Sequence, residues 1–151
     1  MKLSEQQTEQ EKQKAIRKTE LKIQKGIRKT EDDLVQWIEA ALDNKSSYGN
    51  LEESQFRNLL RVAETTESSE VIKNFLRYQV GRDKKWGQGK GSLAEKIIQD
   101  IDNQIKSAAE KIAEEANSTK TKSIHIELIR RYLGYGSRQL KYLNSQRSAQ
   151  I

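Results

Sequence analysis

The chain has 151 residues, a formal net charge of +6, 8 glycines, one histidine, no proline and no cysteine. Its length suits one domain with a single core, and the lack of cysteine excludes a disulfide scaffold and a thiolate metal site. No apolar run reaches the length of a membrane span, so we expect a cytoplasmic protein without a membrane partner. Helix-forming residues dominate and β-branched residues show no alternating runs, which predicts an all-α fold.

Charge alternates in blocks along the chain. Basic side chains outnumber acidic ones over 1–30 (9 to 4), 77–91 (5 to 1) and 120–151 (7 to 1), whereas acidic ones prevail over 31–76 (10 to 4) and 92–119 (6 to 3). Folded together, these blocks predict a molecule with a basic side suited to nucleic acid and an acidic side suited to basic protein neighbours.

Residues 1–29 are thinly apolar and rich in lysine. They predict a basic helical N-terminal extension, or arm, that is partly disordered until it binds. Ile16, Ile23 and Ile27 share one side of this helix. The opposite side carries a line of lysines: Lys14, Lys18, Lys22, Lys25 and Lys29.

Residues 30–145 predict a single-domain bundle of about five helices, because each segment combines an N-cap candidate with an apolar stripe at helical spacing. Thr30 precedes three acidic residues and is the first candidate cap. Asn50 with Glu53, and Ser92 with Glu95, form possible capping boxes. The expected helices span about 30–42, 50–63, 69–81, 92–116 and 124–143.

The last helix, 124–143, has two different faces. His125 lies on the apolar face, where we expect a packed core histidine rather than a base. The opposite face is basic with Gly134 in its middle, a surface that suits a phosphate backbone or, alternatively, only a solvated exterior. Residues 146–151 predict a flexible tail.

Catalytic patterns are missing from the sequence. One histidine and no cysteine leave no Cys–His pair, and neither the HExxH nor the EF-hand metal-binding spacing appears. The loop Gly87–Gly91 is glycine-rich but lacks the GxxxxGK[ST] spacing of a nucleotide-binding loop. We therefore expect no enzyme, no cofactor and no metal site.

Basic side chains on the predicted outer faces are the candidate nucleic-acid contacts, and their role would be to neutralise phosphates without reading bases. Trp86 joins them because it stands in the basic loop and could stack on a base, or else fold back onto the core. The candidate residues are Arg57, Arg61, Lys73, Arg77, Arg82, Lys84, Lys85, Trp86, Lys90, Arg130, Arg131, Arg138 and Lys141.

Three segments together resemble a known family. Glu53–Leu60 (ESQFRNLL), Phe75–Arg82 (FLRYQVGR) and Ile126–Tyr132 (IELIRRY) are similar, in order and spacing, to motifs of the small subunit of type III, Csm-type, CRISPR–Cas effector complexes. The similarity extends from about Thr30 to Leu143. The family's proline is absent, and the first 30 residues form an extension.

The resemblance implies a non-catalytic all-α subunit of an antiviral defence ribonucleoprotein. Such a subunit contacts the backbone of the guide RNA and target RNA without sequence specificity. It also contacts the backbone and large subunits of the complex and other copies of itself. The alternative is a helical protein–protein adaptor with no nucleic-acid role.

Overall fold

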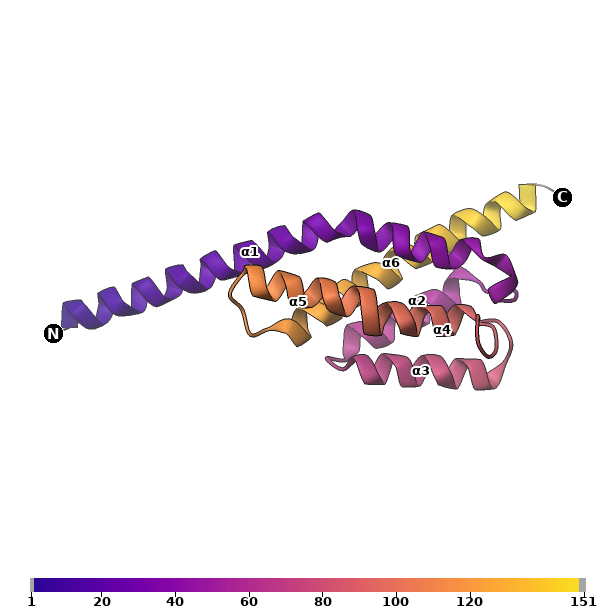
Figure 1. Cartoon of the computed structure of the whole chain (residues 1–151), viewed down its shortest axis with the longest axis horizontal. Coiled ribbons are helices and arrows are strands. Elements are labelled where there is room, and N and C mark those ends of the chain that lie inside the picture. The colour runs from indigo at the N-terminus through magenta and orange to yellow at the C-terminus, as the bar shows by residue number, and fades with distance from the viewer. Residues whose placement is uncertain (1, 150–151) are drawn as a thin grey trace.

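A lysine-rich helix, α1, opens the chain and spans Lys2–Asp43 in the computed structural model, which describes residues 2–149 (Figure 1). A 3₁₀ turn at Lys45–Ser47 and α2, Glu53–Thr65, follow. Then come α3 at Ser69–Arg82, α4 at Leu93–Asp100, a π-helical turn at Ile101–Ile105, α5 at Lys106–Glu115 and α6 at Thr121–Ala149.

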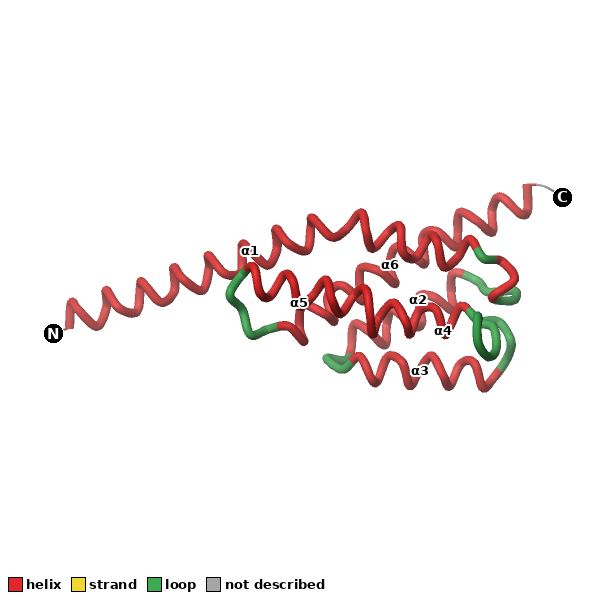
Figure 2. The backbone as a smooth tube through the Cα atoms, in the orientation of Figure 1, coloured by secondary structure: helices red, strands yellow, loops and turns green. Residues whose placement is uncertain are grey.

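Helices and short loops make up the whole of residues 2–149, without a strand (Figure 2). Because α4, the π turn and α5 follow one another without a break, the described residues form five long helices. The predicted all-α bundle is confirmed. α6 is its central element and packs against α1, α2 and α5, while α3 lies outside against α2 and α4.

The predicted helix start at Thr30 is wrong, because α1 continues straight through it. The Thr30 hydroxyl donates to the Gly26 carbonyl 2.8 Å away, a bond made inside a helix rather than at its start. Ile23 and Ile27 are buried in the same stripe as Leu34 and Ile38. The apolar period therefore crosses the predicted boundary at residues 29 and 30, and the last turns of the predicted extension belong to the bundle.

The start of α2 differs from the predicted one by a small shift, whereas the predicted start of α3 at Ser69 is confirmed. Glu52, not Asn50, caps α2, in a capping box with Gln55. Asn50 is excluded because the buried Leu51 separates it from the helix. Ser68 caps α3, with its hydroxyl accepting from the Val71 amide.

The predicted cap at Ser92 is confirmed. Its hydroxyl accepts the amide of Glu95 at 3.1 Å. The long helix that follows ends one residue before the predicted Ala116 but contains a π turn, which the apolar spacing did not reveal.

The predicted core position of His125 is confirmed. Its Nε2 lies 2.7 Å from the carbonyl oxygen of Ile101, at the start of the π turn, and the hydrogen bond requires the tautomer that carries the proton on Nε2. Burial lowers the pKa of His125 below its ordinary 6.5, against a raising effect of that carbonyl. The histidine thus joins α6 to the middle of the long helix.

α6 is longer than predicted at both ends. It runs to Ala149, so the predicted tail at 146–151 is helical over 146–149, and its last two residues lie outside the described part of the chain. Gly136 allows α6 to approach its neighbours closely, since a Cβ there would stand 2.5 Å from the Phe56 ring and 2.8 Å from Ile38.

Candidate nucleic-acid interface

The thirteen candidate contacts fall into two groups once the chain is folded. Four of them are buried or hold partners within the protein: Lys73, Trp86, Arg130 and Arg131. The others reach solvent on α2, α3, α6 and the loop between α3 and α4.

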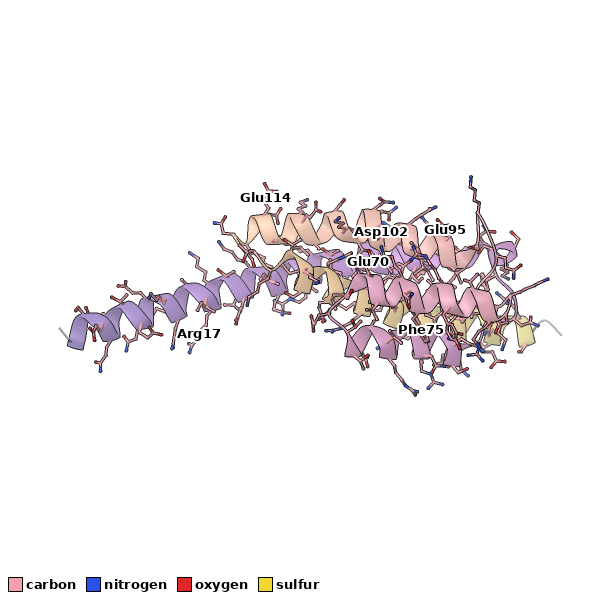
Figure 3. All side chains as sticks on the ribbon, turned by 90° about the horizontal axis from the view of Figure 1, so that it is seen from below. Arg17, Glu70, Phe75, Glu95, Asp102 and Glu114 are labelled. Atoms are coloured by element: carbon pink, nitrogen blue, oxygen red, sulfur yellow. The ribbon has the colours of Figure 1, made fainter. Side chains whose placement is uncertain are left out.

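Lys73 is not an outer-face cation, contrary to the prediction. It is buried, and its Nζ lies 2.7 Å from Glu70 and 2.8 Å from Asp102. Figure 3 shows Glu70 of α3 and Asp102 of the π turn in neighbouring positions. Burial alone would lower the pKa of Lys73, but the two acidic partners outweigh it and raise the pKa above 10.5. The lysine therefore joins α3 to the long helix and is not free to bind phosphate.

Trp86 does not present its ring for base stacking. It is 1% exposed, with its ring centroid 5.2 Å from that of Phe56. The alternative that it folds back onto the core is the correct one. Burying a large aromatic ring stabilises the fold more than leaving the ring exposed at a loop tip. Here the buried ring anchors the glycine-rich loop to α2.

Arg130 and Arg131 hold elements of the fold together. Arg130 donates from Nε to the Ala63 carbonyl at 2.8 Å and from a terminal nitrogen to the Thr66 carbonyl at 3.1 Å, which satisfies free carbonyls at the end of α2. Arg131 pairs with Glu127 on its own helix and with Glu31 on α1. Because these donors are engaged inside the fold, the structure does not favour the predicted role of either arginine as a phosphate contact.

A basic groove lies between α2 and α6. The helices run antiparallel: the Asn144 side-chain amide donates to the Leu51 carbonyl at one end, and Arg130 bonds Ala63 at the other. Arg57 and Lys141 line one groove of about 530 Å³ between them. Its other lining residues are the acidic Glu52 and Glu53 and the uncharged Ser54, Asn144, Ser145 and Ser148.

The same two helices extend the basic groove by one turn. Arg61 follows Arg57 by four residues on α2, and Arg138 precedes Lys141 by three on α6, so each lies one turn further along the same side. Both are exposed, and neither forms an ion pair among the described residues, whereas Arg57 has Glu53 at 4.0 Å. We call Arg57, Arg61, Arg138 and Lys141 the α2–α6 basic groove. Gly134 lies one turn before Arg138 on α6, where an added Cβ would meet only Leu60, at 4.0 Å.

The loop between α3 and α4 forms a second basic region. Lys84 and Lys90 line a hollow of about 300 Å³ together with serines and glycines, and Lys90 also shares a shallow hollow with Arg77 of α3. Gly87 has φ +82°, and a Cβ there would stand 2.1 Å from the Ser47 carbonyl oxygen, so only glycine fits. Arg82 lies over the Tyr78 ring at 5.8 Å, and Lys85 is half-buried.

One basic surface was noted in the sequence but not included among the candidates. Lysines and arginines line one side of α1 from Lys14 to Lys29, all exposed and without ion pairs in the described part of the molecule. Their even spacing at helical period was the available signal. The apolar stripe on the other side of the helix is thin, and it predicted partial disorder instead of a binding surface.

Residues 2–149 contain neither a metal-binding cluster nor a membrane-spanning helix. No group of three or more His, Asp or Glu side chains is placed to hold a metal ion. No helix in this part of the chain is both long and apolar enough to cross a membrane.

The α2–α6 basic groove and the loop between α3 and α4 form a surface that suits a polyanion. Comparison of the chain with known proteins finds no matching family model, curated protein or solved structure.

Proposed function

We propose that this protein is a non-catalytic RNA-binding subunit of a larger ribonucleoprotein, in which the α2–α6 basic groove holds an RNA backbone. The proposal depends on one observation. Arg57 of α2 and Lys141 of α6 line the same groove, and Arg61 and Arg138 extend this basic surface by one turn. These cations reach solvent, while other arginines of α6 are used inside the fold. Arg61, Arg138 and Lys141 form no ion pair among the described residues, and unpaired cations attract polyanions because no internal carboxylate competes for them.

The chemistry of the groove favours backbone contact over base recognition. Its cations stand in two short rows rather than around a pocket, and the buried Trp86 removes the one candidate for base stacking. Phosphate contacts position a strand but carry no sequence information. We therefore expect similar affinity for RNAs of unrelated sequence.

The assembly we propose is the RNA-guided effector complex suggested by the motif order. The three segments that carry the resemblance lie on α2, α3 and α6, and the first and third of them belong to the two helices that form the groove. In that role the protein would contact the guide and target RNA, the backbone and large subunits, and further copies of itself. A CRISPR array and effector genes beside its gene would support this assignment.

The direct test is RNA binding by a groove variant. R61Q/R138Q/K141Q removes three charges from exposed positions, and K106Q/K111Q/K122Q removes three from exposed positions elsewhere as a matched control. Binding of fluorescently labelled single-stranded RNAs of several unrelated sequences is followed by anisotropy over a salt series.

The expected result is a similar loss of affinity for every RNA with the groove variant only. The slope of log K against log salt should fall by about 0.7 for each lost contact, about 2 in all. A loss confined to one sequence would mean that the groove reads bases. If the groove variant binds as the wild type does, the groove is a solvated surface, and the adaptor alternative is then favoured.

A further inference from the structure

A regular line of cations runs along one side of α1. We name it the arm stripe and define it by the seven basic residues that share this side of the helix. At 100° per residue they fall within a sector of about 140°, and from first to last they span about 22 Å of helix. The arm stripe consists of Lys14, Arg17, Lys18, Lys22, Lys25, Arg28 and Lys29.

All seven cations of the arm stripe are available to a ligand. Each is exposed, and none forms an ion pair within residues 2–149. Glu20 is the one acidic residue between Lys14 and Lys29, and it faces away from the stripe. Between Lys14 and Lys29, no carboxylate of the helix therefore lies within the basic sector, and no carboxylate of the bundle pairs with the stripe among residues 2–149.

Half of this surface stands clear of the bundle. Residues 4–18 are all exposed, and α1 projects beyond the other helices (Figure 1). Figure 3 shows Arg17 extending from this projecting part with no other element beside it. Because the packed part of α1, from Ile23 onward, supplies the helix nucleus, the projecting turns need only extend an existing helix.

We propose that the arm stripe binds the phosphate backbone of a nucleic acid, as a contact separate from the α2–α6 basic groove. Five of its seven cations are lysines, which act as point charges and do not read bases as a paired arginine fork can. Their straight line, with about one charge per 3 Å of axis, matches a strand that carries one phosphate at each nucleotide. This inference depends on the proposed function in one respect only, namely that the ligand is a nucleic acid.

A membrane surface fits the arm less well. Binding in the lipid interface needs a continuous apolar side with bulky residues. Ile16 in the projecting part and Leu21 just after it are 55% and 67% exposed, and Leu21 lies within the basic sector rather than opposite it.

The test compares K18Q/K22Q/K25Q with the charge-matched control K106Q/K111Q/K122Q, both in the full chain. The probe is fluorescein-labelled 30-nucleotide poly(U), titrated over a salt series. The arm variant should bind more weakly, with a salt slope lower by about 0.7 per contact and so about 2 in total, while the control should match the wild type. K18R/K22R/K25R, which keeps the charges, should restore the wild-type slope.

Three results would overturn the inference: an unchanged slope in the arm variant, an equal loss in the control, or a failure of the arginine variant to restore binding. Phosphatidylserine vesicles provide the competing probe. If the arm variant loses vesicle binding but keeps poly(U) binding, the stripe is a membrane contact.

The groove variant R61Q/R138Q/K141Q, measured in the same titration, separates the two proposals. If only the arm variant loses affinity for poly(U), the proposal for the arm stripe is supported and the proposal for the groove is refuted. If only the groove variant loses affinity, the groove proposal is supported and the arm-stripe proposal is refuted.

Discussion

At the scale of single residues, two arginines of α6 have the same chemistry but different functions. Arg130 bonds two carbonyls at the end of α2, whereas Arg138, two turns later on the same helix, is exposed without a partner among the described residues. The sequence alone assigned both to the same basic face. The difference arises because only Arg130 lies opposite the end of another helix.

These two arginines should differ in their effect on stability. Arg130→Ala leaves the Ala63 and Thr66 carbonyls without a protein donor and should lower the free energy of unfolding by about 1–3 kcal/mol. Arg138→Ala should change it by less than about 0.5 kcal/mol. Urea unfolding followed by circular dichroism measures both, and equal effects would contradict the assigned roles.

His125 should make stability depend on pH. Burial is the main cause that lowers the pKa of His125 in the folded state, and the charges of Lys106 and Lys73 add to it, against the Ile101 carbonyl and Asp102. The unfolded chain therefore binds the proton first. Stability should be full above the ordinary pKa of about 6.5 and should fall as pH drops below it, until the folded-state pKa is passed.

The measurement for His125 is the free energy of unfolding between pH 8 and pH 5. His125→Gln should remove the part of the pH dependence that begins near 6.5, a slope of at most about 1.4 kcal/mol per pH unit. If the variant keeps the wild-type slope in this window, another group causes it.

At the scale of elements, α6 shows how packing decides what a glycine contributes. A Cβ at Gly136 would collide with Phe56 and Ile38, while a Cβ at Gly134 would meet only Leu60, at 4.0 Å. Both lie inside the same helix, where alanine is intrinsically better than glycine by about 1 kcal/mol.

The two glycines therefore predict changes of opposite sign. Gly134→Ala should stabilise the protein by about 0.5–1 kcal/mol, because nothing opposes the gain in helix propensity. Gly136→Ala should destabilise it, since overpacking costs about 1–3 kcal/mol and outweighs that gain. Thermal unfolding of the two variants compares them directly, and a stabilised Gly136→Ala would mean that α1 and α2 shift aside readily.

At the scale of the whole molecule, α1 belongs to the bundle in one half and projects from it in the other. Residues 4–18 bury nothing in the core, whereas Ile23 and Ile27 are part of it. Removing residues 2–18 should thus leave the unfolding free energy within about 0.5 kcal/mol of the full chain, while the helical signal falls. Calorimetry tests this, and a large loss of stability would show that the projecting part packs on the bundle.

The sequence by itself determined the helical class, the apolar stripes and the cap at Ser92, because these depend on local periodicity and on hydrogen bonds to neighbouring amides. It did not show that α1 continues through Thr30, because a threonine before three acidic residues also suits a helix start, and the burial of Ile23 and Ile27 against the bundle is a tertiary feature. It placed Arg57, Arg61, Arg138 and Lys141 on outer faces, but their meeting at one groove depends on the antiparallel packing of α2 and α6. Only the tertiary structure decided which cations remain free, because Lys73, Arg130 and Arg131 each have a partner that lies 29 to 100 residues away in the chain and approaches only on folding.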